Sequence, residues 1–402
     1  MHILLIHQAF AALNEPGGTR HHEFARYLAQ QGHRVTVIAS PVSYLTGSAE
    51  QAKRVEQDEY GVTVLRSYTY NALHRSFVHR VFSFLSFMAS SFITGLRVKN
   101  VDLVWGTSPP IFQGVTAWAL ARLKGVPFLF EVRDLWPAFA EAVGVLTNPT
   151  LIAASRWLER FLYRRADQVM VNSPGFIEHI QARGAKDIVL IPNGADAAMF
   201  DPEDDGAAFR QTHNLKDKFI ALYAGAHGLS NDLNIVLDAA QQLQANPNIA
   251  IVLLGDGKDK ATLQQRAAEM QLSNVHFLPP VAKTEMAQAL AAADVCIAIL
   301  KPIEMYKTVY PNKVFDYMAA GRPVLLAIDG VIREVVEAGD AGLFVQPGNP
   351  TALAAATAQL ANDPQAAQQM GRKARSYLEQ HFDRSRLASK LQRVIEELGK
   401  RE

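Results

Sequence analysis

Short apolar runs alternate with helical patterns along the whole chain, and this alternation limits the possible folds more than any other feature of the sequence. In the first half, strand-like runs such as Ile3–Ile6 and Val35–Ala39 are separated by helical patterns such as residues 20–31. The second half repeats the alternation, starting with Phe219–Ala224 and Ala250–Leu254. Such alternation is typical of βαβ units, so it predicts an α/β fold with a parallel sheet in each half.

The length of the chain and the turn-forming residues near its middle indicate two domains. The chain has 402 residues, and domains usually contain ~100–200 residues. Residues 192–215 contain prolines, a glycine and the acidic run Glu203–Asp205, a composition that suits a linker. The tail from Asp383 has an apolar stripe at helical spacing that must bury against another surface. We therefore predict domains at residues 1–195 and 196–382, followed by a terminal helix at residues 383–402.

Charge and cysteine content exclude several classes of protein. The formal net charge of +1 argues against a strongly electrostatic nucleic-acid binder, so we expect no nucleic-acid partner. The single cysteine, Cys296, allows no intrachain disulfide and lies in an apolar run, which predicts a reducing compartment and a buried structural thiol. No signal-type segment opens the sequence, and no window has the ~18–20 apolar residues of a spanning helix. We expect a cytoplasmic protein, soluble or peripheral on the inner face of the cytoplasmic membrane.

Glycines follow the first strand-like run of each half. Ligands of doubly wound sheets bind at the carboxyl ends of strands, where helix N-termini favour phosphate. In EPGGTRHHEFARYL, Gly17 and Gly18 precede a helix that begins near Arg20 and His21. This is not the GxGxxG motif, which argues against an NAD-dependent oxidoreductase. An ordinary glycine-rich loop with a solvated basic turn is the alternative.

The motif YAGAHG, at residues 223–228, holds an imidazole close to a strand end. Gly225 and Gly228 flank His227, and glycine allows backbone geometries that a Cβ would block. A surface histidine in a turn is the alternative interpretation.

The motif PNKVFDYMAAGRPV is the most specific of the chain. Pro311 stands where helices like to start, with Asn312 and Lys313 in the first turn and Asp316 one turn later. A cation and free amides could hold a diphosphate, and a carboxylate could accept hydrogen bonds from two ribose hydroxyls. The alternative is a surface ion pair between Lys313 and Asp316.

Charged residues follow the apolar strand of the motif FLFEVRDLWPAF. Glu131, Arg133 and Asp134 lie at its end, where charges are costly unless they are solvated or paired. An acceptor or leaving-group site would explain them, and so would a simple arginine–carboxylate pair. Trp136 could stack on a sugar or belong to the core.

These motifs together resemble the family-4 retaining glycosyltransferases of GT-B fold. The matching segments are GGTRHHEFARYL, EVRDLWP, IPNGAD, YAGAHG and PNKVFDYMAAGRPV, in family order along nearly the whole chain. The sequence is similar in particular to the bacterial branch that includes the N-acetylfucosamine transferases of O-antigen and capsule synthesis (WbuB-like). The resemblance implies two Rossmann-like domains facing across a cleft, with the acceptor mainly on the first, the donor mainly on the second, and the terminal helix returning to the first.

The resemblance also implies roles for individual residues. The sequence departs from the family pattern in three places. Thr308 replaces the first glutamate of E-x7-E, and Arg133 stands where many members have a histidine. The Arg and Lys that usually clamp the diphosphate are absent, and His227 and Asn231 lie in that region instead. The expected catalytic residues are Arg133, Asp134, His227 and Lys313; the expected donor-binding residues are Gly17, Gly18, Gly225, Asn231, Leu278, Asn312 and Asp316; the expected acceptor-binding residues are Arg20, His21, Glu131 and Trp136.

The expected activity is transfer of a sugar with retention of configuration. The donor would be a UDP-sugar that carries N-acetylfucosamine or another N-acetylamino sugar, and the acceptor a growing, polyprenyl-linked surface glycan. The sequence has no Asp-x-Asp carboxylate clamp, so we expect neither a metal ion nor another cofactor. A nucleotide-sugar epimerase and a non-catalytic nucleotide-sugar sensor are the alternatives. Residues 74–99, rich in aromatic residues and basic at both ends, are expected to lie in a membrane interface or to form a core helix.

Overall fold

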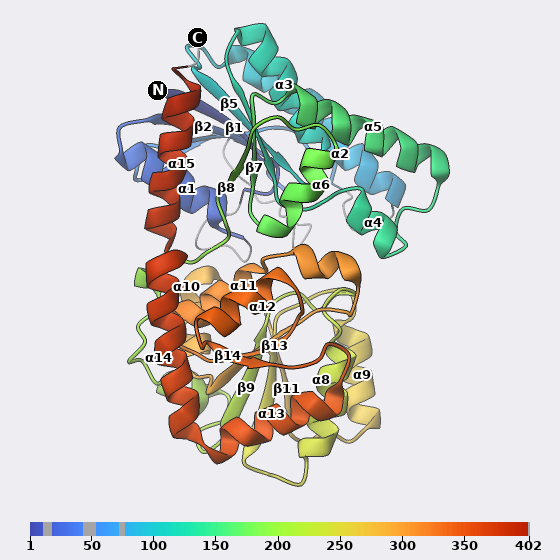
Figure 1. Ribbon diagram of the computed structural model, residues 1–402, viewed down its shortest axis with the longest axis vertical. Helices are drawn as coiled ribbons and strands as arrows, with labels where there is room; N and C mark the ends of the chain where they lie inside the picture. The colour runs from blue at the N-terminus through green and yellow to red at the C-terminus, as the bar shows by residue number, and fades with distance from the viewer. Residues whose placement is uncertain (11–17, 43–53, 72–76, 401–402) are drawn as a thin grey trace. The chain divides into compact units, whose positions relative to one another are not determined.

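The computed structural model describes residues 1–10, 18–42, 54–71 and 77–400. They form two compact units: Met1–Pro192 together with Ser385–Glu402, and Asn193–Arg384. Each unit is built on a largely parallel sheet with helices on both faces, which confirms the predicted α/β class (Figure 1).

The first unit contains an eight-stranded sheet in the order β3-β4-β2-β1-β5-β6-β7-β8, in which only the β3–β4 pair is antiparallel. Its strands are β1 His2–Ile6, β2 Arg34–Ala39, β3 Val55–Gln57, β4 Thr63–Arg66, β5 Leu103–Ser108, β6 Phe128–Val132, β7 Gln168–Val171 and β8 Ile188–Leu190. Its helices are α1 Arg20–Gln30, α2 Phe77–Arg97, α3 Phe112–Lys124, α4 Ala138–Ala142, α5 Pro149–Arg165, α6 Ile177–Ala182 and α15 Arg384–Leu398, with a 3-10 turn at Pro174–Phe176. The strand order reverses between β1 and β5, which makes their carboxyl ends the topological switch point.

Local sequence explains where the helices beside this sheet begin and end. The Asn148 side chain accepts hydrogen bonds from the amides of Thr150 and Leu151 and so caps α5, with Pro149 in its first position. Helix α3 ends at Gly125, whose φ of 67° is left-handed and therefore suits glycine. Helices α2, α3 and α5 are neighbours on one face of the sheet.

The terminal helix α15 packs beside α1 on the other face of this sheet. Its Leu391 and Ile395 are 0% exposed and belong to the same hydrophobic cluster as Ile3 and Leu5 of β1 and Phe24 of α1. The apolar stripe of the tail is therefore buried against a sheet formed by the other end of the chain.

The second unit contains a six-stranded, wholly parallel sheet in the order β11-β10-β9-β12-β13-β14. Its strands are β9 Phe219–Ala224, β10 Ile249–Leu254, β11 Val275–Leu278, β12 Val295–Ile299, β13 Val324–Ala327 and β14 Gly342–Phe344. Its helices are α7 Ala207–Thr212, α8 Leu233–Leu243, α9 Lys260–Glu269, α10 Lys283–Ala291, α11 Asn312–Ala319, α12 Val331–Ala338, α13 Pro350–Asn362 and α14 Pro364–His381, with 3-10 turns at Ala197–Met199 and Glu304–Thr308. The order reverses between β9 and β12.

Successive residues of the central strands enter two different hydrophobic clusters. In β9, Leu222 lies in one cluster and Ala221 and Tyr223 in the other, so both faces of the sheet are covered. Cys296 of β12 is fully buried, as predicted, and burial raises the pKa of its thiol above the usual value. Among the described residues, no helix is long and apolar enough to span a membrane.

Candidate functional site

Three glycines lie at the switch point of the second unit. Gly225 follows β9, and Gly255 and Gly257 follow β10; their φ angles are 149°, 145° and 157°. A Cβ on Gly255 would lie 1.9 Å from the carbonyl oxygen of Gly225, and one on Gly257 would lie 2.4 Å from the carbonyl oxygen of His227. The two loops therefore pack backbone against backbone, which only glycine permits here.

His227 is buried between these loops with both ring nitrogens free. Its side chain is 0% exposed, and neither Nδ1 nor Nε2 has a hydrogen-bond partner among the described residues. Burial, and then the charge of Lys260, lower its pKa to about 4. The ring is therefore neutral, with one donor and one acceptor unsatisfied, which is costly unless a ligand or water supplies partners. The alternative of a surface histidine is wrong.

Lys313, in the first turn of α11, brings a cation to the same place. Its Nζ lies 3.9 Å from the ring centroid of Tyr223 and 3.4 Å from Oδ1 of Asn231. A Cβ on Gly225 would lie 2.9 Å from Nζ. Burial lowers the pKa of Lys313 to about 7, and within the described part of the chain no carboxylate forms an ion pair with it. The site thus offers a partly buried cation without an anion.

Asp316 pairs with Lys283 of α10 instead of Lys313. The distance between Lys283 Nζ and Asp316 Oδ1 is 2.5 Å, so the alternative of a Lys313–Asp316 ion pair is wrong. Lys283 stands after a double proline, and no local pattern marks it as a partner of Asp316. Asn312 is exposed at the start of α11.

Lys260 ties the loops after β10 and β11 together. Its Nζ donates to the carbonyl oxygens of Gly255, at 2.7 Å, and Leu278, at 3.1 Å. The motif LLGDGKDK, which contains Lys260, resembles a common turn when the sequence is considered alone. The way Lys260 links the two loops is therefore visible only in the three-dimensional structure. Leu278, a predicted neighbour of the base, is half-buried.

The switch point of the first unit is organised around one buried carboxylate. Glu131, at 0% exposure, accepts hydrogen bonds from Arg20 Nε at 2.9 Å, His21 Nε2 at 2.6 Å and Trp105 Nε1 at 3.2 Å. Burial alone would raise the pKa of Glu131, but His21 and Arg20 outweigh it and hold that pKa well below its usual value. Burial lowers the pKa of His21 to about 4.

This network fixes α1 to the sheet and to the end of the unit. The Arg20 guanidinium also donates to the carbonyl oxygens of Ile191 and Pro192, both at 2.7 Å. Arg20 and His21 are 3% and 1% exposed, so the alternative of a solvated basic turn is wrong. Their polar groups are turned inward, a geometry suited to positioning other groups.

His7 extends this network to the edge of the sheet. Its Nδ1 lies 2.8 Å from Oγ1 of Thr107, and its ring centroid is 3.9 Å from that of His21. No sequence pattern selects His7, because a histidine at the end of an apolar run belongs to no motif.

The residues after β6 are less buried. Arg133 is half-buried, with Nη2 3.4 Å from the carbonyl oxygen of Pro109. Burial raises the pKa of Asp134 to about 6, against the opposing charge of Arg133. Trp136 is half-buried, and its ring centroid is 6.4 Å from that of Phe112.

The glycines predicted after β1 give a mixed result. Gly17 lies outside the described residues. Gly18 is exposed, and a Cβ there would meet no atom within 4 Å, so its own surroundings do not require glycine. No group of three or more His, Cys, Asp and Glu side chains in the described ranges could hold a metal ion.

Two family models match the chain, one in each half. The model described as glycosyl transferase 4-like domain matches residues 17–194, and the model described as glycosyl transferases group 1 matches residues 205–377. One curated relative is WcaI of Escherichia coli (strain K12), by name a colanic acid biosynthesis glycosyl transferase. It is 27% identical over 74% of this chain and 76% of its own length.

Solved structures of the same architecture cover almost the whole chain. Sucrose-phosphate synthase of Thermosynechococcus elongatus has a TM-score of 0.81 at 19% identity, over 99% of this chain and 98% of that one. HepE of Anabaena in complex with UDP-glucose has a TM-score of 0.72 at 18% identity, over 99% and 100%. At such identities the likeness establishes the fold, which is of the GT-B type with two Rossmann-like domains.

Proposed function

This chain is a glycosyltransferase with a glycosyl transferase 4-like domain and a glycosyl transferases group 1 domain, and from that premise we propose that it moves a sugar from a UDP-sugar to a growing, polyprenyl-linked surface glycan. Transfer proceeds with retention of configuration and without a metal ion. The sugar is N-acetylfucosamine or another N-acetylamino sugar. The group 1 domain holds the donor, and the 4-like domain holds the acceptor.

One observation carries the proposal: an unpaired cation and an unsatisfied imidazole lie together at a glycine-lined switch point. Lys313 is close enough to His227 for its charge to contribute to the lowered pKa of that ring. Because Gly225 has no Cβ, the ammonium of Lys313 can lie directly against its backbone. A diphosphate supplies the anion that Lys313 lacks and an acceptor for the His227 N–H. The complexes of HepE with UDP and UDP-glucose support a nucleotide sugar as this ligand.

The same groups would assist bond breaking. As the bond between the sugar and the diphosphate breaks, negative charge grows on the departing oxygen. A fixed ammonium and a fixed N–H aimed at that oxygen stabilise the charge more in the transition state than in the ground state. Asp316, held by Lys283, is positioned on the same helix to accept hydrogen bonds from the ribose.

The acceptor side uses the residues after β6. Asp134, whose pKa is about 6, is mainly ionised at neutral pH and can accept a proton from an acceptor hydroxyl. Arg133 interacts with developing charge, and Trp136 offers a partly exposed ring to a sugar. We assign to Arg20, His21 and Glu131 a positioning role, because their polar atoms are buried.

A donor screen tests the proposal. The purified chain is incubated with UDP-, GDP- and dTDP-sugars, with and without polyprenyl-diphosphate-sugar acceptors, and products are followed by mass spectrometry. Acceptor-dependent release of UDP that is lost in Lys313→Ala and retained in excess EDTA is the expected result. Isomerisation of the donor without acceptor would point to an epimerase, and tight donor binding without turnover would point to a sensor. Strict dependence on Mn²⁺ or Mg²⁺ would contradict the metal-independent mechanism.

A polyprenyl-linked acceptor implies contact with a membrane. Helix α2, which lies within residues 74–99, exposes Val78, Phe82 and Ile93 to between 54% and 59%, while its Gly95 packs against Leu120 of α3. The helix therefore combines a buried side with an apolar exposed side. We include peripheral contact through this exposed side in the proposed function.

A further inference from the structure

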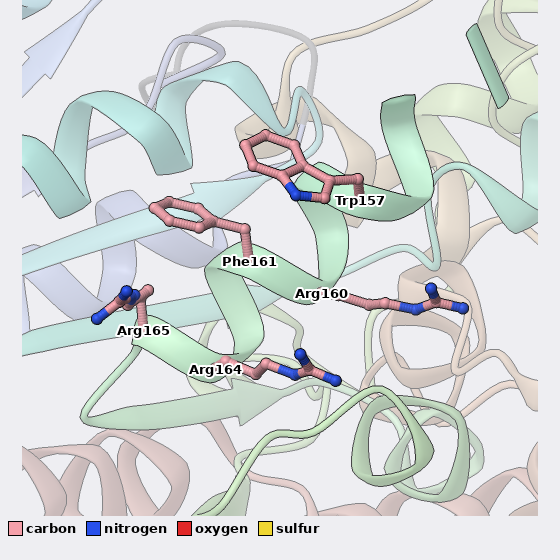
Figure 2. A pocket seen from close by; sticks show the side chains of 5 residues that line it. All are labelled: Trp157, Arg160, Phe161, Arg164 and Arg165. Atoms are coloured by element: carbon pink, nitrogen blue, oxygen red, sulfur yellow. The ribbon is translucent and has the colours of Figure 1, made fainter. Parts of the chain in front are cut away.

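Helix α5 carries a second surface that the proposed function does not use. Five of its side chains line a surface pocket: Trp157, Arg160, Phe161, Arg164 and Arg165 (Figure 2). Trp157 is 64% exposed, yet its ring stacks on Phe161 at a centroid distance of 5.5 Å and an interplanar angle of 19°. Phe161 in turn meets Trp118 of α3 edge-on at 4.8 Å. The exposed indole is therefore held on a fixed base. We call these five residues the α5 patch.

The three arginines of the α5 patch leave it positively charged. All three are exposed, and none forms an ion pair with a carboxylate within the residues that the structure describes. Three nearby carboxylates have other partners: Glu159 is buried with His179 and Arg183, Glu141 pairs with Arg156, and Asp167 accepts a hydrogen bond from the amide of Phe128. The ion pairs of the described residues therefore do not include the three arginines of the patch.

The surroundings of the patch are both apolar and basic. Of the fourteen large hydrophobic side chains exposed in the described parts of the chain, ten lie between Val78 and Trp157, and one, Leu229, lies in the second unit. Residues 77–165 contain ten Lys and Arg against five Asp and Glu, while the whole chain has a net charge of only +1. Since α2, α3 and α5 are neighbours on one face of their sheet (Figure 1), exposed apolar and cationic side chains are concentrated in one helical layer.

We propose that the α5 patch, together with the exposed side of α2, docks the protein on the surface of an anionic lipid bilayer. The indole and the apolar side chains enter the headgroup region, and the arginines bind lipid phosphates. An acidic protein or glycan would match the arginines but not the exposed apolar side chains beside them. The inference rests on the proposed function, whose peripheral contact through α2 it extends to the α5 patch and to anionic lipids.

Vesicle sedimentation tests the docking. The full chain is mixed with vesicles of phosphatidylcholine alone and of an equimolar mixture of phosphatidylcholine and phosphatidylglycerol. We expect binding to the mixed vesicles that Arg160→Gln/Arg165→Gln weakens about 25-fold, because each arginine near an anionic surface contributes about fivefold. The control Lys216→Gln/Arg372→Gln removes the same charge from exposed positions of the second unit and should bind as the unchanged protein does.

Fluorescence supplies a second readout at Trp157. The emission difference between the unchanged protein and Trp157→Phe isolates this indole among the four tryptophans. It should shift to shorter wavelength on mixed vesicles and not on neutral ones. Equal binding by the arginine variant, equal binding to neutral vesicles, an unshifted Trp157 emission, or binding to a soluble acidic polysaccharide in place of vesicles would each overturn the proposal.

The two proposals fail separately. Sugar transfer to a water-soluble acceptor depends on Lys313 and not on the α5 patch, so Arg160→Gln/Arg165→Gln should leave it unchanged. Charge-dependent vesicle binding without any sugar transfer would remove the proposed function and leave the docking intact. Transfer without charge-dependent binding would leave the sugar transfer intact and remove the docking, including the membrane contact of α2.

Discussion

At Lys313 the side chain places an ammonium group beside the ring of Tyr223, and burial lowers its pKa to about 7. His227, two residues beyond Gly225, keeps a buried ring with two unsatisfied nitrogens. Both arrangements are unfavourable without a partner, and a bound diphosphate would supply an anion to Lys313 and an acceptor to the N–H of His227. Perturbed groups of this kind concentrate at functional sites.

The first prediction concerns proton uptake on donor binding. Above pH 7 Lys313 of the free protein is mainly neutral, and a bound diphosphate should restore its proton and raise its pKa. The affinity for UDP should therefore fall as pH rises through 7, by at most tenfold per unit, with up to one proton taken up. Titration calorimetry in buffers of different ionisation enthalpy measures this uptake. Lys313→Arg, which stays charged, should bind without it, and an equal uptake by Lys313→Arg would disprove the assignment.

The second prediction concerns stability at the same residue. Because the folded pKa of Lys313 lies below its unfolded value of 10.5, the charged form destabilises the fold. This cost is fully present below pH 7 and disappears as pH rises towards 10.5. Lys313→Met should thus abolish transfer yet raise the Tm at pH 6, with a smaller gain at pH 9. If calorimetry gave Lys313→Met a lower Tm at pH 6 than the unchanged protein, burial of the Lys313 ammonium would not destabilise the fold.

At the scale of elements, the loops after β9 and β10 pack without side chains, and the carboxyl of Glu131 holds α1 against β6. In the first case the packing depends on the absence of a Cβ, and in the second on the presence of a single acceptor. Both contacts join elements that follow different strands, and both lie at a switch point.

The third prediction tests the glycine loops. In Gly255→Ala the new Cβ would meet the Gly225 carbonyl oxygen, and the φ of 145° disfavours any side chain. We expect the free energy of unfolding to fall by about 1–3 kcal/mol and the free energy of UDP binding to weaken by a similar amount, because the loops must move apart. Gly228→Ala is the matched control, since a Cβ there meets nothing within 4 Å. Denaturant unfolding and UDP titration of both variants check the prediction, and equal behaviour would refute it.

The fourth prediction tests the buried carboxylate. Glu131→Gln leaves the Arg20 charge buried without its partner, which should cost about 3–5 kcal/mol of unfolding free energy. Glu337→Gln, at an exposed i,i+4 pair with Arg333, is the control and should cost less than about 0.5 kcal/mol. Urea unfolding at neutral pH compares the two. A loss at Glu131 as small as that at Glu337 would mean that the network does not hold α1.

At the scale of the whole molecule, the first unit is completed by a segment from the other end of the chain. Helix α15 contributes buried residues to the cluster formed by β1, β2 and α1, although 192 residues of the second unit separate it from Pro192. The first unit is therefore built from two segments that lie far apart in the sequence.

The fifth prediction follows from this division. A fragment of residues 1–192 should fold poorly, because it lacks α15 and so leaves the apolar face of the sheet exposed. The fragment loses the buried side chains of Leu391 and Ile395, each of which contributes about 2–5 kcal/mol to stability. Addition of a peptide of residues 384–402 should restore folding, and a peptide with Leu391→Ala and Ile395→Ala should not. Circular dichroism and thermal unfolding measure both. A fragment 1–192 as stable alone as with the peptide would contradict the prediction.

The sequence by itself determined the α/β class, a largely parallel sheet in each half, the burial of Cys296 and the selection of His227 and Lys313 as candidate site residues, because these depend on patterns within a few neighbouring residues. Only the tertiary structure decided which charges meet. Asp316 pairs with Lys283 and not Lys313, and Glu131 lies within a buried network with Arg20. These contacts join residues 33 and 111 positions apart, and their geometry is fixed by how helices pack on the sheet, which local spacing does not encode. For the same reason the α5 patch became visible only when packing left Trp157 exposed beside three unpaired arginines.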